Sequence, residues 1–164
     1  DLSADDMIEA VRRQARDGVD FATVHCGVTK KTAAHASDRL MGIVSRGGSF
    51  MARWMAAHGE ENPFYERFDE IIQIAREYDM TLSLGDALRP GALADAGDAS
   101  QTAELETLGE LAARARKAGA QVMNAFVSRL LGHGRNAAST LALFVKLQAV
   151  RTTSCCPSSL PSAV

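Results

Sequence analysis

The sequence predicts an α/β fold in which short parallel strands alternate with helices. Short apolar runs end in glycine-containing polar loops, and an amphipathic helical pattern follows each loop. This order of strand, loop and helix recurs about four times, at intervals of roughly 20 to 40 residues. Parallel strands need long crossover connections, which helices usually supply. The pattern therefore predicts either a (β/α) barrel or a doubly wound sheet.

Length and composition are those of one folded domain. The chain has 164 residues, of which 46% are hydrophobic and 23% are charged. A domain of this size buries about 70% of the surface of its unfolded chain. No apolar run approaches the roughly 20 residues of a membrane span, and the formal net charge of -2 provides no basic face for phosphate backbones. We therefore expect no membrane partner and no nucleic-acid partner.

Cysteine usage predicts a reducing compartment. Cys26 is isolated, and Cys155 and Cys156 are adjacent, so the 3 cysteines cannot form a disulfide framework. The first residues lack the basic and apolar regions of a secretory signal peptide. We therefore expect a cytoplasmic protein.

The boundaries of the predicted elements follow from their capping and turn residues. Ser3 is a candidate N-cap, and the apolar residues that follow it at helical spacing predict a helix ending near Gly18. Alternating residues before Gly27 predict a first strand, and the apolar run 41–44 predicts a second. The remaining predicted elements are helices over residues 29–40, 50–59 (capped by Ser49), 64–78 and 100–118, and strands over residues 80–84 and 120–123.

Three polar segments follow successive predicted strands. They are His25, the loop Ser45–Gly48 and the loop Asp86–Arg89. In both candidate folds, ligands meet the loops at the carboxyl ends of the strands. One ligand could therefore contact all three segments.

The loop SRGGS has the groups that an anion site needs. Gly47 and Gly48 let backbone N–H groups approach an oxyanion, Ser45 supplies a hydroxyl, and Arg46 can pair with a phosphate. The alternative is an ordinary turn with the glycines chosen for backbone conformation and Arg46 in solvent.

The other two segments also allow two interpretations. In the loop GDALRPG, Asp86 can accept from a substrate hydroxyl or amine while Arg89 binds an anion; alternatively, the two side chains bind each other. His25 is either a ligand-binding or acid–base residue, or a hydrogen-bonded residue of the core or its rim. Cys26 is interpreted as a packing residue, because no activating arrangement accompanies it.

The charge pattern changes near the end of the last predicted helix. All 20 acidic residues lie between Asp1 and Glu110, and the ending RTTSCCPSSLPSAV is rich in Ser, Pro and Cys. Composition places a boundary between residues 120 and 126. We expect residues 1–123 to form one structured part and residues 124–164 to be a divergent tail, frame-shifted or disordered.

Three blocks of sequence resemble the phosphomethylpyrimidine synthase (ThiC) family. They are GVDFATVHCGV (18–28), GIVSRGGSFMARWMAAHGEENPFYERFDEIIQIAREYDMTLSLGDALRPG (42–91) and AELETLGELAARARKAGAQVM (103–123). They occur in the family's order and spacing. The resemblance is specific, because several long blocks agree rather than one short motif.

The resemblance implies a fold and an activity. The family has a (β/α)8 barrel, and this chain would supply about four of its strand–helix units, since a whole barrel needs about 250 residues. Its members are radical S-adenosylmethionine lyases of thiamine biosynthesis, which use a 4Fe-4S cluster and zinc and form homodimers. They convert 5-aminoimidazole ribonucleotide into 4-amino-5-hydroxymethyl-2-methylpyrimidine phosphate, with release of formate and carbon monoxide.

The resemblance also assigns roles to individual residues. His25 matches a substrate-contacting histidine. The remaining implied substrate-binding residues are Ser45, Arg46 and Gly47 in one loop, and Asp86, Ala87, Leu88 and Arg89 in a second. The family usually has glycine at position 87; if the loop needs a positive φ there, Ala87 would cost about 1 kcal/mol.

The chain departs from the family pattern after Met123. The family continues with Glu-Gly-Pro-Gly-His, which supplies a substrate-binding glutamate and a metal ligand, whereas this chain has Ala125 and Arg129 at those positions. His133 is displaced from the pattern, and the family's later metal histidine and its C-x2-C-x4-C cluster motif are absent. The cluster and zinc ligands are therefore missing from this chain, and we expect it to be an inactive fragment.

Two other functions remain open from the sequence. The related 5-hydroxybenzimidazole synthase uses the same substrate, and the retained blocks do not distinguish it from a phosphomethylpyrimidine synthase. The chain could also be a non-catalytic phosphate-binding remnant that keeps both loops.

Overall fold

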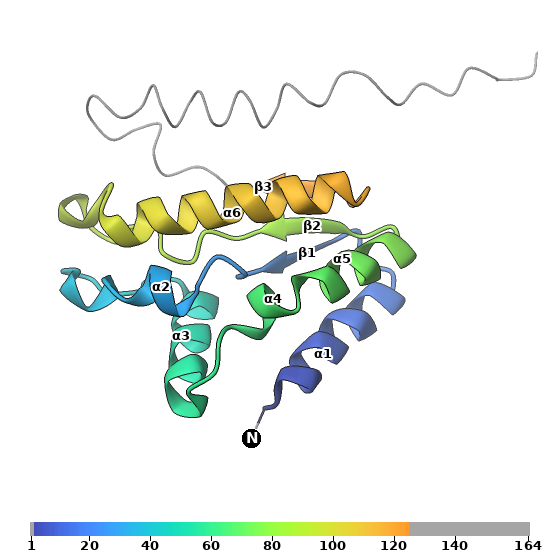
Figure 1. The fold of residues 1–164 in the computed structure, drawn as a ribbon, viewed down its shortest axis with the longest axis horizontal. Coiled ribbons are helices and arrows are strands. Elements are labelled where there is room, and N and C mark those ends of the chain that lie inside the picture. The colour runs from blue at the N-terminus through green and yellow to red at the C-terminus, as the bar shows by residue number, and fades with distance from the viewer. Residues whose placement is uncertain (1, 125–164) are drawn as a thin grey trace, which may run out of the picture. The chain divides into compact units, whose positions relative to one another are not determined.

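The computed structural model describes residues 2–124, and its architecture is α/β, as predicted. Three parallel strands, β1 (Phe21–Val24), β2 (Thr81–Leu84) and β3 (Val122–Asn124), form a sheet in the order β1-β2-β3. The other described elements are α1 (Ala4–Arg16), α2 (Lys30–Ala33), η1 (Ala36–Asp38), α3 (Arg46–His58), α4 (Pro63–Glu66), α5 (Phe68–Glu77), η2 (Leu93–Asp95) and α6 (Ala99–Lys117) (Figure 1). The predicted divergent tail lies, apart from Asn124, outside the described residues.

Side-chain caps fix where helices α1 and α6 begin. Ser3 and Asp6 form a capping box at the start of α1, in which Ser3 Oγ accepts from the Asp6 N–H at 3.1 Å. At the start of α6, the carboxylate of Asp98 accepts from the Gln101 N–H at 2.8 Å. The predicted first helix and last helix are therefore confirmed.

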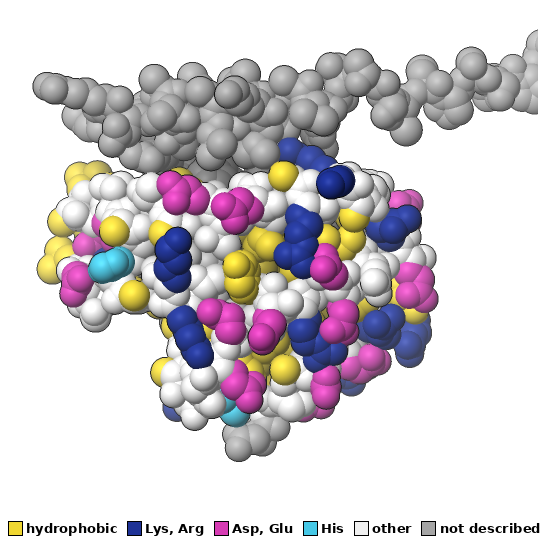
Figure 2. Space-filling view, viewed as in Figure 1, with side chains coloured by type: hydrophobic (Ala, Val, Ile, Leu, Met, Phe, Trp, Pro, Cys, Tyr) yellow, Lys and Arg dark blue, Asp and Glu magenta, His cyan; other side chains and the backbone are white. Residues whose placement is uncertain are grey.

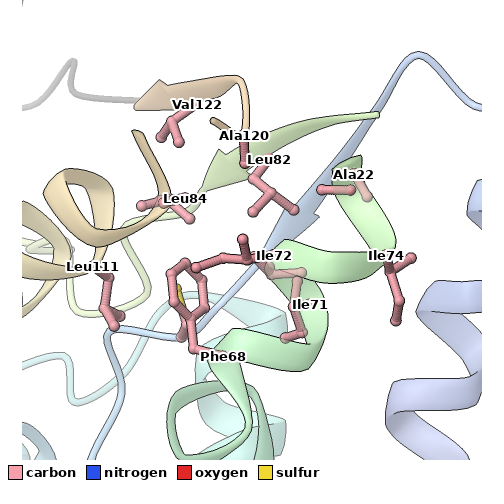
Figure 3. Close-up of a cluster of buried hydrophobic side chains, with 14 of the residues drawn as sticks. Ala22, Phe68, Ile71, Ile72, Ile74, Leu82, Leu84, Leu111, Ala120 and Val122 are labelled. Atoms are coloured by element: carbon pink, nitrogen blue, oxygen red, sulfur yellow. The ribbon is translucent and has the colours of Figure 1, made fainter. Parts of the chain in front are cut away.

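The core lies between one face of the sheet and helices α1, α5 and α6. Alternate strand residues, among them Leu82 and Leu84, point to this face. Figure 3 shows Phe68 and Ile71 of α5 within the same cluster, and both are fully buried. These three helices therefore cover one side of the sheet.

The opposite face of the sheet carries exposed side chains. Phe21 of β1 is 57% exposed and Met123 of β3 is 43% exposed. Both occupy the alternate positions to the core residues Ala22 and Val122. None of the helices in residues 2–124 is long and apolar enough to cross a bilayer.

The predicted strand over residues 41–44 is wrong. The segment is an irregular connection between η1 and α3. The carboxylate of Asp95 accepts from the N–H groups of Leu40 at 2.8 Å and Met41 at 3.0 Å, in place of a neighbouring strand. Gly42 has a φ of 59°, which interrupts any extended conformation.

Two predicted helices are shorter than their sequence patterns indicated. The segment 29–40 contains only the single turn of α2 and the 3-10 turn η1. The segment 64–78 divides into α4 and α5 at Arg67, which has φ −101° and ψ 29°. The Arg67 carbonyl accepts from the N–H groups of Glu70 and Ile71, so the hydrogen-bond ladder of α5 begins anew at this residue.

Ion pairs link the exposed faces of the helices. Arg114 of α6 pairs with Asp69 of α5 at 2.7 Å, and Arg12 of α1 pairs with Glu77 of α5 at 3.6 Å. On the face seen in Figure 2, acidic and basic side chains are interspersed. Each exposed pair contributes little to stability, because solvent screens it.

Replacement of Phe68 with alanine tests the role of the core. Phe68 is fully buried, whereas Phe50 of α3 is 50% exposed and provides a matched control. We expect Phe68→Ala to lower the free energy of unfolding by about 3 to 5 kcal/mol and Phe50→Ala by less than about 1 kcal/mol, measured by urea denaturation. Equal losses for the two variants would contradict this account of the core.

Candidate functional site

The imidazole of His25 lies between two glycines that are far apart in the sequence. His25 directly follows β1, and Gly85 directly follows β2. A Cβ at Gly85 would lie 2.8 Å from His25 Nδ1, and a Cβ at Gly47 would overlap His25 Cδ2. The start of α3 and the ends of two neighbouring strands therefore meet at this histidine.

The start of α3 also contacts the loop after β2. A Cβ at Gly48 would lie 2.6 Å from the Cβ of Ala87 and 3.0 Å from its carbonyl oxygen. Side chains at positions 47 and 48 would therefore separate α3 from both strand ends. The three segments singled out in the sequence are in contact in the structure.

The segment SRGGS is the first turn of α3 rather than a loop before it. The predicted N-cap Ser49 is wrong: Ser45 is the N-cap, and its Oγ accepts from the Gly48 N–H at 3.2 Å. The first turn of α3 contains no acidic residue. A helix start presents N–H groups and the positive end of the helix dipole, both of which favour anions.

The serine and arginine of this turn differ in exposure. Ser45 is buried, whereas Arg46 is exposed. Within residues 2–124, no hydrogen bond or ion pair involves the side chain of Arg46. Its guanidinium is therefore accessible to a ligand at the helix start.

The loop after β2 has two partly exposed polar residues and two buried apolar ones. Arg89 Nη1 donates to the backbone carbonyl of Asp86 at 3.0 Å, so Arg89 binds the main chain of Asp86 rather than its carboxylate. The side chains of Ala87 and Leu88 are fully buried. Among the described non-glycine residues, only Asp79 has a positive φ. The loop therefore does not need a positive φ at Ala87, and the cost expected for alanine there does not arise.

Burial shifts the pKa values of two site residues. Burial lowers the pKa of His25, and the nearby charge of Arg89 acts in the same direction, while the Gly85 carbonyl, 3.4 Å from Nδ1, partly offsets them. Burial also raises the pKa of Asp86, against the effect of Arg89. The neutral form of His25 is therefore favoured at pH 7.

Two buried polar residues that sequence reasoning missed hold the loops in place. Asn62 Nδ2 donates to the carbonyls of His25 and Val28, at 2.8 and 2.7 Å. Glu104 accepts from the backbone of the loop after β2. The burial of Glu104 could have been predicted from its position on the apolar stripe of α6, four residues before Leu108.

A cavity of about 280 Å³ opens beside His25 and Gly47. Residues of α1 and α3, including Met7 and Phe50, line it together with Thr23 of β1. Its walls are mainly apolar, as in most small-molecule sites.

The described residues do not fit an iron–sulfur cluster or a zinc ion. In residues 2–124, no group of three or more His, Cys, Asp or Glu side chains is placed to hold a metal. Cys26 is fully buried, and burial raises the pKa of its thiol to about 12. The interpretation of Cys26 as a packing residue agrees with this environment.

Comparison with protein families decides where the chain belongs. The model of the radical SAM ThiC family matches residues 1–129. The chain belongs to the radical SAM ThiC family. The resemblance predicted from its sequence blocks is thereby confirmed.

Relatives in the ThiC family include three phosphomethylpyrimidine synthases. Those of Dehalococcoides mccartyi and Thermus thermophilus are 59% and 57% identical over 124 and 125 residues, which are 74% and 75% of this chain and 29% of each relative. That of Thermococcus kodakarensis is 49% identical over 154 residues, which are 93% of this chain and 35% of the relative. The chain thus spans about a third of the length of these ThiC-family relatives.

Substitution of Gly47 tests the close approach of α3 to His25. We expect Gly47→Ala to lower the free energy of unfolding by about 1 to 3 kcal/mol, because the added methyl overlaps the imidazole, and to shift the His25 ring signals in NMR spectra. Gly109→Ala in α6 is the control, since its Cβ meets open space; it should stabilise the helix by about 0.5 to 1 kcal/mol. Unchanged His25 signals in Gly47→Ala would contradict the described contact.

The pH dependence of stability tests the burial of Glu104. Burial raises its pKa from 4.5 to about 7, so the folded protein keeps a proton that the unfolded chain releases between these values. The free energy of unfolding, relative to that of Glu104→Gln, should therefore fall by about 3 kcal/mol as pH rises from about 4.5 to above 7. If urea denaturation gave parallel pH profiles for the two proteins, the raised pKa of Glu104 would be contradicted.

Proposed function

We propose that this chain forms the ribonucleotide-binding part of a phosphomethylpyrimidine synthase. The observation that carries the proposal is the convergence of His25, the start of α3 and the loop after β2. Family membership supports it, since relatives that are 59% and 57% identical carry that name. The proposed substrate is 5-aminoimidazole ribonucleotide, and the proposed product of the whole enzyme is 4-amino-5-hydroxymethyl-2-methylpyrimidine phosphate.

The start of α3 binds the phosphate of the substrate in this proposal. The N–H of Gly47 and the exposed guanidinium of Arg46 act as donors. The Ser45 hydroxyl accepts from Gly48 and can donate its own proton. The lack of an acidic residue in this turn supports the assignment.

The strand ends bind the remainder of the ribonucleotide. Asp86 accepts from a hydroxyl or amine, Arg89 supplies positive charge, and neutral His25 forms hydrogen bonds through its ring. Ala87 and Leu88, whose side chains are buried, act through the backbone that holds Asp86 and Arg89.

S-adenosylmethionine and an iron–sulfur cluster, which the family name indicates, supply the radical chemistry of the whole enzyme. Because residues 2–124 contain no suitable set of metal ligands, we assign only substrate binding to them.

We further propose that β1, β2 and β3 are neighbouring strands of a (β/α)8 barrel. Their parallel order and the helices on one face support this arrangement. The exposed Phe21 and Met123 would then face the barrel interior.

Binding of 5-aminoimidazole ribonucleotide to the 164-residue chain tests the proposed function. We expect isothermal titration calorimetry to detect binding, and Arg46→Ala and Arg89→Ala each to weaken it about tenfold, because each removes a charge-assisted hydrogen bond. Arg53→Ala, an exposed arginine later in α3, is the control and should leave the affinity unchanged. Failure of the unmodified chain to bind, or an equal loss in Arg53→Ala, would refute the proposal.

A further inference from the structure

Glu104 is a fully buried carboxylate that contacts the site loop through its backbone. Oε1 accepts from the Ala87 N–H at 2.8 Å, and Oε2 accepts from the Leu88 N–H at 2.7 Å. Each oxygen thus binds a different, consecutive peptide group. When Glu104 is ionised, each of these hydrogen bonds is about twice as strong as one to a neutral acceptor, so the pair of bonds fixes the orientation of both peptides.

The orientation of the Asp86–Ala87 peptide determines where the Asp86 carbonyl points. In a trans peptide, the N–H and the preceding carbonyl point in opposite directions. Because the Ala87 N–H points to Glu104, the Asp86 carbonyl points away from it, and this carbonyl accepts from Arg89 Nη1 at 3.0 Å. Glu104 is therefore connected to the guanidinium of Arg89 through a single peptide group.

Glu104 also lies against the loop after β1. A Cβ at Gly27 would lie 2.8 Å from Glu104 Cγ. Gly27 is two residues beyond His25, so Glu104 contacts the loops that carry His25 and Asp86. No other side chain in the described part of the chain is found to accept from the N–H groups of both Ala87 and Leu88.

Three titratable or charged groups face Glu104. Asp86 raises its pKa and Arg39 lowers it, while Glu104 itself raises the pKa of the buried Cys26 thiol. Arg39 also donates to the Leu88 carbonyl at 2.6 Å, so both backbone groups of Leu88 are held. Burial is the main cause of the raised pKa of Glu104, and its hydrogen bonds to the loop favour the ionised form.

We propose that Glu104 is a positioning residue that orients the Asp86–Arg89 loop so that Asp86 and Arg89 stay beside His25. The effect of Glu104 on ligand affinity rests on the proposed function, whereas the effect of Glu104 on the orientation of the loop does not. The carboxylate acts through the peptide groups of the loop and does not itself contact the substrate.

Amide NMR of the 164-residue chain tests the effect on the loop. We expect the amide protons of Ala87 and Leu88 to move together with pH, with a midpoint near the Glu104 pKa of about 7, and to lie furthest downfield when the carboxylate is ionised. His25 is followed separately through its ring protons, because its pKa is lowered from 6.5. Movement of only one of the two amide signals with this midpoint would overturn the proposal, because both N–H groups bind the same carboxylate.

Glu104→Gln removes the titration and one of the two acceptors. We expect the pH dependence of both amide signals to disappear and the affinity for 5-aminoimidazole ribonucleotide to fall about tenfold. Glu106→Gln, an exposed glutamate on the same helix, is the matched control and should leave both measurements unchanged. A shared titration that persists in Glu104→Gln, or unchanged affinity in that variant, would overturn the proposal.

The outcomes separate the two proposals. If the unmodified chain does not bind the ribonucleotide, the proposed function fails, and the amide titration alone decides whether Glu104 orients the loop. If the unmodified chain binds with the same affinity as Glu104→Gln, the proposed function stands and the positioning role of Glu104 fails.

Discussion

The lack of side chains at two consecutive positions of α3 is the constraint on which the site depends. Glycine is a poor helix former, and each one costs about 1 kcal/mol relative to alanine in a helix interior. At Gly47 and Gly48, however, a Cβ would collide with His25 and Ala87. The two glycines let the helix start reach the ends of β1 and β2. Side chains at these two positions would prevent the first turn of α3 from contacting both strand ends.

The sequence predicted those parts of the fold that short-range patterns determine. The alternation of strands and helices located β1, β2 and β3, and the end signals of α1 and α6 came from their own caps. Since the ends of parallel strands gather at one edge, the meeting of His25 with the loop after β2 could also be predicted. Each of these features depends either on residues that are close in sequence or on the general geometry of parallel sheets.

Two predictions, the strand over residues 41–44 and the N-cap Ser49, are wrong for the same physical reason: contacts between residues that are distant in sequence. The apolar run 41–44 has the composition of a strand, but its neighbouring amides bind Asp95, which lies 54 residues from Met41. Serine is a good N-cap at either position 45 or position 49, so residue type alone does not decide where α3 begins. Packing of the glycines against the strand ends places the cap at Ser45 instead. Tertiary contacts therefore determine both the conformation of residues 41–44 and the start of α3.

The backbone of the loop after β2 separates the buried carboxylate of Glu104 from the guanidinium of Arg89. Glu104 is enclosed by two N–H groups of the loop, and the opposite side of the same peptide faces Arg89. The loop backbone thus lies between the carboxylate and the guanidinium. A buried charge is costly unless hydrogen bonds compensate for it, and here the compensating bonds are those that orient the loop. Burial of the Glu104 carboxylate therefore both costs stability and orders the loop after β2.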